Sequence, residues 1–418
     1  MRVLIVTAGS RGDVTPYTGL GARLRAAGHR VTLAAPAAFA PLAAGCGLDF
    51  RAIPGDLSAL RASDSDQRPS RSPPGAAGVL EFLRLGNRFV DDLGDGIAAA
   101  AEPGADVLLL SSTTAPLGYS VAQAHGVPSL GVFLQPLYPT GAFPPTLLNV
   151  PSLGRWGNRT AGRLGHALAR RVYADASRRL RARLGLPPAG LGGLDRRAAT
   201  EGWPVKHGFS PAVVPRPADW RPGLDVVGYW WPAGSDDWRP PAELLDFLAA
   251  GPPPVYVGFG SMGHASDQLD ALVTGSLRRA GVRGIVQADA VGPGPGRPVS
   301  ADVLAIGEAP HDWLFPRMAA LVHHAGCGTT AAGLRAGVPA VPVPMLADQP
   351  FWAGRLAALG TGPDAVPFRR LTEEGLATAI RAAVTEPAFA RRARAVADRL
   401  ADEDGAGAVV AALDRLAG

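Results

Sequence analysis

Seven consecutive residues near position 324 have the side chains and the spacing to hold an anion. They are His324, Ala325, Gly326, Cys327, Gly328, Thr329 and Thr330, and they follow the short apolar run 319–323. That run predicts a buried strand, and the small residues after it predict a tight turn that opens a helix. Glycine lets a ligand approach the backbone, and the first turn of a helix presents unpaired N–H groups at the positive end of its dipole. His324, Thr329 and Thr330 add side-chain donors, so the turn predicts a binding site for a phosphate or diphosphate.

Two polar residues follow the next predicted strand, 340–343. Asp348 and Gln349 combine carboxylate oxygens with an amide, a set that suits hydrogen bonds to the hydroxyls of a sugar. The pair favours a hexose that keeps the hydroxyls at its 3 and 4 positions. Together with the turn at His324, it predicts a ligand that carries both a diphosphate and a sugar.

Asp13 is the candidate general base for a reaction on such a ligand. It lies at the start of a predicted helix. With Thr15 as the helix cap and Pro16 at the first helical position, the carboxylate of Asp13 would be free to point outward, whereas Asp13 as the cap would be structural. A carboxylate with an ordinary pKa of about 4 is a weak base toward an alcohol, so catalysis requires its burial or a late proton transfer.

Short apolar runs alternate with segments of helical spacing along the chain. Strands that are apolar throughout must be covered on both faces, so this pattern predicts an α/β fold with parallel sheets. The predicted strands are 3–7, 30–35, 107–110, 129–133, 255–259, 284–286, 303–306, 320–323 and 340–343.

Proline and glycine indicate where one Rossmann-like domain ends and the next begins. Pro215, Pro217, Pro222 and Pro232 interrupt regular structure before the strand at 255. We therefore expect a first domain at 1–220, a linker at 221–240, a second domain at 241–402 and a final helix within 403–418.

Composition excludes several classes of protein. The 418 residues are 47% hydrophobic, which is enough for two domains with large cores. The net charge of +5 comes almost entirely from arginine, with Lys206 as the only lysine. Such enrichment in Arg, Ala, Pro and Gly is typical of a GC-rich genome, so we expect no nucleic-acid partner. Two cysteines are too few for a disulfide framework, and no apolar run is long enough for a transmembrane segment, so we expect a cytoplasmic protein. We expect it to be a monomer or a homodimer.

The turn at His324 and the later Asp348-Gln349 resemble the donor site of nucleotide-sugar-dependent glycosyltransferases of the GT-B fold. Residues 255–262 resemble the family's phosphate loop, 309–316 the segment that supplies an aromatic platform for the base, and Gly9-Ser10-Arg11-Gly12-Asp13 the start of its acceptor domain. The likeness is strong over 1–54 and 222–370 and weak between them. Within the family the chain is most similar to the bacterial sterol 3β-glucosyltransferase-like branch and to glycopeptide and macrolide glycosyltransferases.

This resemblance implies the GT-B architecture, in which two Rossmann-like parallel-sheet domains face each other across a cleft and the last helix packs back on the first domain. It implies an inverting, metal-independent transfer of a hexose from a UDP- or dTDP-sugar, without a further cofactor, to a hydroxyl of a lipophilic natural-product aglycone. Asp13 would be the base. The donor contacts it implies are Ser10, Arg11, Ser261, Trp313, His324, Gly326, Gly328, Thr329, Thr330, Asp348 and Gln349.

The segment that would bind the acceptor is the least informative part of the sequence. Aromatic side chains between 56 and 151 predict an apolar pocket without identifying its occupant, and they are Phe82, Phe89, Phe133, Tyr138 and Phe143. Asp64-Ser65-Asp66 has the Asp-x-Asp form of metal-dependent transferases, but no predicted strand surrounds it, so we expect no metal site. The arginine-rich helical segment 155–186 predicts a solvated face, with contact to a membrane surface or to the acceptor as the alternative.

Other functions remain open. A nicotinamide or flavin oxidoreductase would fit the βαβ unit at 3–33, but Gly9-Ser10-Arg11-Gly12 is not Gly-x-Gly-x-x-Gly, and Ala34-Ala35-Pro36 lacks the acidic residue that binds an adenosine ribose. A nucleotide-sugar epimerase and a catalytically silent nucleotide-sugar-binding partner would share the fold. The presence of Asp13 together with His324 and Asp348-Gln349 favours the transferase.

Overall fold

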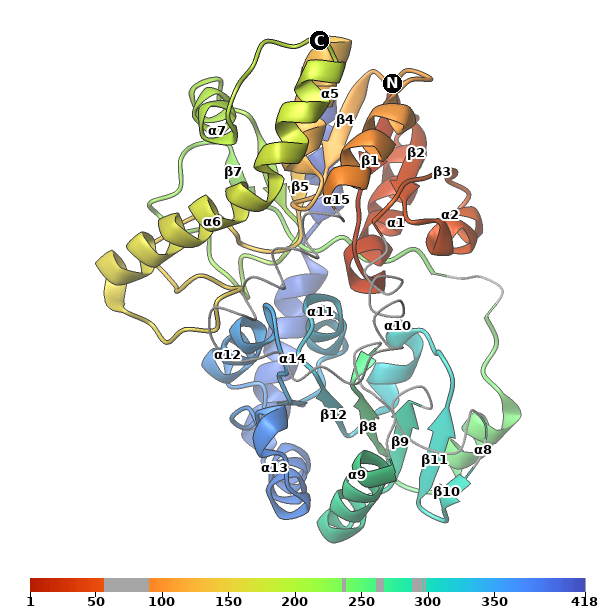
Figure 1. Cartoon of the computed structure of the whole chain (residues 1–418). Helices are drawn as coiled ribbons and strands as arrows, with labels where there is room; N and C mark the ends of the chain where they lie inside the picture. Colours follow the sequence, from red (N-terminus) through yellow and green to blue (C-terminus); the bar gives the residue numbers. More distant parts are fainter. Residues whose placement is uncertain (56–89, 235–237, 261–266, 288–295, 297, 418) are drawn as a thin grey trace.

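Two sheets of mainly parallel strands form the two halves of the molecule in the computed structural model (Figure 1). The structure describes residues 1–55, 90–234, 238–260, 267–287, 296 and 298–417. The fold is therefore α/β, as the alternation of apolar runs predicts.

The first sheet has the order β3-β2-β1-β4-β5-β6-β7, and each of its pairings is parallel. The interior strand β1 is buried on both faces, with Leu4, Ile5 and Val6 at most 1% exposed, because helices cover both sides. The strands are β1 (Arg2–Val6), β2 (Arg30–Ala35), β3 (Asp49–Ala52), β4 (Val107–Leu110), β5 (Ser129–Phe133), β6 (Val205–His207) and β7 (Leu224–Val226). The helices are α1 (Arg11–Ala26), α2 (Ala40–Gly45), a helix over 90–101, α5 (Ala115–His125), α6 (Gly154–Arg183) and α7 (Leu191–Thr200).

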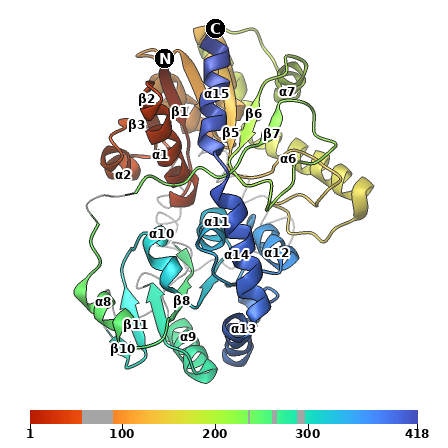
Figure 2. The ribbon, with the colours of Figure 1, turned by 180° about the vertical axis from the view of Figure 1, so that it is seen from behind.

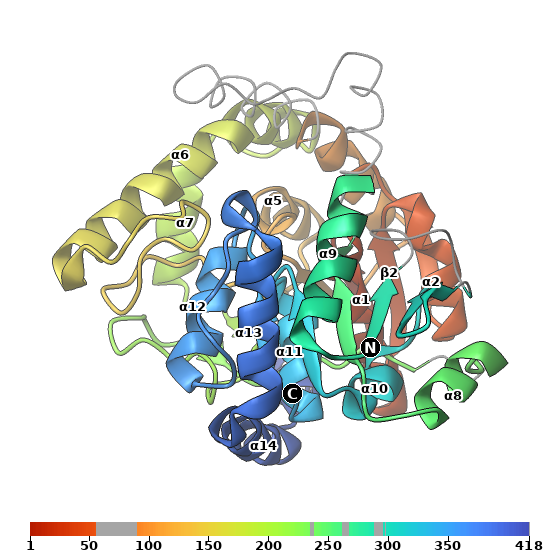
Figure 3. The same ribbon diagram turned by 90° about the horizontal axis from the view of Figure 1, so that it is seen from below.

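The second sheet has the order β10-β11-β9-β8-β12-β13, with an antiparallel strand only at the β10 edge. Its strands are β8 (Val255–Gly258), β9 (Gly284–Gln287), β10 (Pro298–Ser300), β11 (Val303–Ile306), β12 (Ala320–His323) and β13 (Ala340–Pro342). Helices α9 (Asp267–Ala280) and α13 (Glu373–Thr385) contact each other closely, as Figure 3 shows from below. The remaining helices are α8 (Ala242–Ala249), α10 (His311–Leu314), α11 (Cys327–Ala336) and α12 (Gln349–Leu359).

The last two helices belong to different halves of the molecule. Helix α14 (Pro387–Ala401) packs against α11 in the second half, and α15 (Gly405–Ala417) packs against α1 in the first (Figure 2). The indole N–H of Trp230 donates to the carbonyl of Gly405 at 3.1 Å, which fixes the start of α15 beside the chain that leaves the first sheet. The chain thus crosses back to the first half before it ends.

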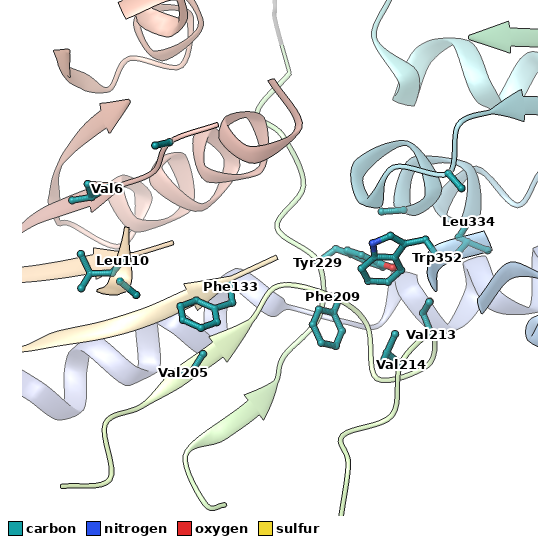
Figure 4. Packing of buried hydrophobic residues seen from close by; sticks show 14 of the residues in the cluster. Val6, Leu110, Phe133, Val205, Phe209, Val213, Val214, Tyr229, Leu334 and Trp352 are labelled. Atoms are coloured by element: carbon teal, nitrogen blue, oxygen red, sulfur yellow. The ribbon is translucent and has the colours of Figure 1, made fainter. Parts of the chain in front are cut away.

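Buried apolar side chains continue from one half into the other. Figure 4 shows Val6, Leu110 and Phe133 of the first half on one side of this cluster, and Leu334 of α11 with Trp352 of α12 on the other. Phe209 lies between them, with its ring centroid 6.0 Å from that of Trp352. The two sheets are therefore joined by packed side chains as well as by the chain itself.

Each predicted strand is present within one residue of its expected bounds. Strands β3, β6, β7 and β10 were not expected. The β7 strand lies inside 221–240, the segment predicted as a linker, because Leu224 is buried and pairs with β6 after the turn at Gly223. Within the part of the chain that the structure describes, no helix has the length and apolar character that crossing a membrane requires.

Candidate active-site cleft

A cleft of ≈ 2490 Å³ lies between the two halves of the molecule. Its walls include residues at or just beyond the carboxyl ends of β5, β8 and β12, where ligands bind in parallel sheets. A pocket for one small ligand usually measures about 300–1,000 Å³. This cleft therefore has room for a donor and an acceptor together.

Asp13 lies in the wall formed by the first turn of α1. The helix begins at Arg11 with Ser10 as its N-cap, so the expectation of a cap at Thr15 is wrong. The hydroxyl of Thr15 instead donates to the Arg11 carbonyl, and Pro16 lies inside the helix. Ser10 and Asp13 form a capping box, which is the arrangement that satisfies the unpaired N–H at a helix start.

The two carboxylate oxygens of Asp13 have different partners. Oδ2 accepts from both the backbone N–H and the hydroxyl of Ser10, each at 2.9 Å. Among the residues that the structure describes, Oδ1 accepts only a long hydrogen bond of 3.4 Å, from Nε2 of Gln135. Burial raises the pKa of Asp13 above its usual value, while the hydrogen bonds from Ser10 and Gln135 oppose that rise. Asp13 is therefore both a capping residue and a carboxylate with one oxygen available to a ligand.

His324 lies at the opposite wall, directly after β12. Ala325 follows it with a φ of 61°, a left-handed conformation that costs a non-glycine residue about 1 kcal/mol or more. A Cβ added at Gly326 would be 2.5 Å from Nε2 of His324, and one at Gly260 would be 2.9 Å from its Cε1. The two glycines thus leave room for the imidazole, and Gly326 is also the N-cap of α11.

Burial makes the imidazole of His324 neutral. It lowers the pKa of His324 to about 4, against a smaller opposing effect of a hydrogen bond with the Gly258 backbone. Nδ1 is buried without a hydrogen-bond partner in the described part of the chain. A buried nitrogen of this kind at the edge of a cleft is available to a ligand.

The threonines of this turn differ in position. Thr329 lines the cleft together with Gly326 and Gly328. Thr330 is 1% exposed, and its hydroxyl has no hydrogen-bond partner within the described residues. The expectation that Thr330 offers its hydroxyl to a ligand does not agree with this position, because its side chain is in the interior of the domain rather than on the wall of the cleft.

Asp348 and Gln349 form the start of α12 and also line the cleft. Oδ2 of Asp348 accepts from the indole N–H of Trp352 at 2.8 Å. Burial raises the pKa of Asp348, and the charge of Asp13 across the cleft adds to the rise. The carbonyl oxygen of Gln349 accepts from the N–H groups of Met345 and Leu346, so its amide nitrogen is the atom left for a ligand.

Two helix starts meet at the centre of the cleft. Helices α1 and α11 contact each other, and both begin at its wall. The thiol of Cys327, in the first turn of α11, lies 3.5 Å from the Leu134 carbonyl of the first half. Arg11 reaches across to Glu308, with 2.8 Å between the guanidinium and the carboxylate. Two dipoles and one arginine therefore make the centre favourable for an anion.

The structure does not place Trp313 on the wall of the cleft. The Arg317 guanidinium lies over its ring at 4.2 Å, and the ring of Trp238 lies 5.1 Å away. The residues of this segment that line the cleft include His311 and Asp312. The prediction of an aromatic platform at Trp313 is therefore not met in this conformation, because other side chains cover the indole.

The apolar end of the cleft is built by the first half. Of the aromatic residues predicted there, Phe133, Tyr138 and Phe143 line it, and Phe133 stacks on Tyr138 with 6.0 Å between ring centroids. No sequence motif singled out several other lining residues, because they come from distant positions on α6 and from the segments that follow β5, α7 and β7. They are Gln135, Leu148, Leu168, Tyr173, Trp203 and Trp231.

Some predicted residues lie outside the described part of the chain. They are Ser261, Phe82, Phe89 and the Asp64-Ser65-Asp66 run. Among the described residues, no group of three or more His, Cys, Asp or Glu side chains is arranged to hold a metal ion.

Two protein families match the two halves of the chain. Residues 3–140 match the glycosyltransferase family 28 N-terminal domain, and residues 285–416 match the C-terminal domain of erythromycin biosynthesis protein CIII-like proteins.

Individual relatives cover nearly the whole chain. The chain is 38% identical to an O-mycaminosyltylonolide 6-deoxyallosyltransferase of Streptomyces fradiae, over 97% of this chain and 95% of that protein. It is 33% identical to a sterol 3-beta-glucosyltransferase of Arabidopsis thaliana, over 99% of this chain and 68% of that protein. Its fold is similar to that of the Streptomyces sp. SF2575 glycosyltransferase SsfS6 complexed with thymidine diphosphate, with a TM-score of 0.63, 23% identity and 99% of each chain covered.

Proposed function

The chain belongs to the nucleotide-sugar-dependent glycosyltransferases of the GT-B fold, and from this premise we propose that it transfers a hexose from a UDP- or dTDP-sugar to a hydroxyl of a lipophilic natural-product aglycone. The observation that carries the proposal is the position of Asp13. Its carboxylate lies across one cleft from the His324 turn and from Asp348, within reach of the charge of the latter. A base, an anion site and a hydroxyl-binding pair thus share one space.

Asp13 acts as the general base through Oδ1. Oδ2 is engaged by both donors of Ser10, whereas Oδ1 has only the 3.4 Å contact with Gln135. As the acceptor oxygen attacks the anomeric carbon, its proton passes to Oδ1, and the bond from that carbon to the diphosphate breaks with its electron pair on the leaving group. The raised pKa of Asp13 makes the carboxylate a better base than an exposed one. Attack opposite the leaving group inverts the anomeric centre.

The diphosphate leaves with protein donors around it. The first turn of α11 supplies N–H groups and the positive end of its dipole, and neutral His324 supplies an imidazole N–H. Arg11 approaches from the first half of the molecule. These donors are in a position to stabilise the negative charge of the leaving diphosphate, as a divalent metal does in other transferases, so the proposed reaction is independent of metal.

Asp348 and the amide nitrogen of Gln349 bind the hydroxyls of the sugar, while the aromatic side chains of the first half enclose the aglycone. The domain at 1–220 is accordingly the acceptor domain in this proposal, and 241–402 is the donor domain. The residues 403–418 complete the acceptor side through α15, which packs on α1.

The test is a screen of an aglycone library against UDP-glucose and dTDP-sugars, read by mass spectrometry, with and without a chelator. Asp13→Asn should retain binding of the nucleotide and lose transfer by a factor of about 10²–10⁴, the usual contribution of a general base. His324→Ala should weaken binding of the nucleotide itself. Full transfer by Asp13→Asn would remove this residue from the base role, and loss of activity with the chelator would overturn metal independence.

A further inference from the structure

Six of the ten exposed large hydrophobic side chains among the described residues lie within residues 147–168 of the first half. Of the large hydrophobic side chains exposed there, Trp156 is 89% and Leu164 67% exposed, and both are on α6. The N-terminal end of α6 projects from the body of the molecule (Figures 1 and 3). The neighbouring exposed side chains are Leu147, Leu148, Leu153 and Leu168. We refer to these six residues as the α6 patch.

Arginines accompany these apolar side chains on the same helix face. Trp156, Arg163, Leu164 and Arg171 are spaced so that one stripe of an α-helix carries all four. Residues 154–171 contain no Asp or Glu. Arg159 and Arg170 reach acidic partners at 3.9 and 2.9 Å, but Arg155, Arg163 and Arg171 have no acidic partner within the described residues.

The α6 patch is continuous with the proposed acceptor site. Leu147, Leu148 and Leu168 are exposed to solvent and also line the cleft. Leu148 holds the loop against the helix, since its Cδ1 is 3.4 Å from the position of a Cβ at Gly165. An apolar path therefore runs from the outer surface of α6 to the aromatic end of the cleft.

We propose that the α6 patch docks the protein on an anionic lipid bilayer, with Trp156 and the leucines in the interfacial layer and the free arginines at the lipid phosphates. A bilayer offers the apolar depth and the negative surface that this combination requires. A second copy of the chain would place one arginine stripe against another, which charge repulsion opposes. For the enzyme, the lipophilic acceptor then enters the cleft from the membrane along the leucines, and only this consequence rests on the proposed function.

The experiment is co-sedimentation of the full chain with vesicles of phosphatidylcholine, with and without phosphatidylglycerol, at low and high salt. The protein should bind the anionic vesicles and lose most of that binding at high salt. Two variants should each weaken partitioning into the vesicles by about tenfold or more. One combines Trp156→Ser with Leu164→Ser, and the other combines Arg155→Gln, Arg163→Gln and Arg171→Gln. Leu245→Ser with Arg391→Gln is the matched control, because Leu245 is 45% exposed on α8 and Arg391 is exposed on α14.

All of these changes are at exposed positions, so thermal unfolding should stay within about 2 °C of the parent, which separates docking from misfolding. Failure of the proposed function would leave the vesicle result unchanged, because no sugar transfer is measured. Equal partitioning of all variants would overturn the proposal. The proposal would also be overturned if the protein is a dimer in solution and the variant with Trp156→Ser and Leu164→Ser is a monomer, since the α6 patch would then be the contact between two copies of the chain.

Discussion

Replacing Gly328 by alanine tests directly whether the first turn of α11 binds the diphosphate. A Cβ at this position meets no atom of the described residues within 4 Å, and the backbone does not have a positive φ, so this part of the structure tolerates the change. A less flexible unfolded chain should stabilise the variant by about 0.4–1 kcal/mol. Gly328 lines the cleft, however, and a methyl group against a phosphate oxygen should remove at least one charged hydrogen bond. Such a bond contributes about 1.5–3 kcal/mol, so the dissociation constant should rise by about tenfold to a hundredfold.

Titration calorimetry with UDP and dTDP measures this loss, and two other glycines give the comparison. Gly354→Ala on α12 also meets no atom within 4 Å and does not line the cleft, so it should share the gain in stability without changing affinity. Gly326→Ala should lower both the stability of the protein and its affinity for the nucleotide, because the new Cβ would be 2.5 Å from Nε2 of His324. If Gly328→Ala gains stability and binds both nucleotides as tightly as the parent, the diphosphate does not lie at this helix start.

Other positions give tests of different parts of the cleft. Glu308→Gln should leave Arg11 free for the phosphates and tighten nucleotide binding by up to about fivefold at low salt. Weaker binding in titration calorimetry would instead show that Glu308 itself binds the ligand. The control is Asp49→Asn, which removes the exposed ion pair with Arg30. Asp13→Ala should lower the free energy of unfolding by about 1 kcal/mol through loss of the capping box, whereas Asp13→Asn keeps an acceptor for the Ser10 N–H and should unfold nearer the parent in calorimetric scans. The free energy of unfolding should fall as the pH drops from about 6.5 to 4, because four buried histidines with lowered pKa values bind protons more readily in the unfolded chain. The raised pKa values of the buried carboxyls act in the opposite direction. A melting temperature that rises toward pH 4.5 would show that the carboxyls have the larger effect. These histidines are His207, His311, His323 and His324, with pKa values of about 4, 4, 3 and 4.

The central strands could be predicted because burial on both faces leaves an unbroken apolar run. Strands such as 107–110 and 320–323 are entirely buried and contain almost no polar residue. The missed strands have three or four residues, and three of them carry charged side chains: β3 has Asp49 and Arg51, and Lys206 of β6 forms an ion pair with Asp225 of β7. An apolar pattern cannot identify a strand of three residues whose side chains are half polar.

The position of a residue at the cleft could be predicted where a strand leads into a helix. Gly326 and Asp348 line the cleft because each directly precedes a helix, α11 or α12, that follows a strand of the second sheet. Thr330 and Trp313 do not line the cleft, because the direction of a side chain depends on its neighbours in space, such as Trp238 beside Trp313. A signal for the start of α1 was present, since Ser10 with Asp13 three residues later has the spacing of a capping box.

The two passages of chain between the halves lie side by side, and this limits how the cleft can open. A Cβ at Gly405, where the chain returns, would be 2.3 Å from the carbonyl oxygen of Gly228, where it leaves. Both connections therefore pass through nearly the same point, which is a pivot for rotation of one domain against the other. Arg11 and Glu308 pair across the cleft between the halves, so rotation about this pivot would separate them. Opening of this protein should be a hinge motion with its axis at the two glycines, in which the core at Trp352 moves least.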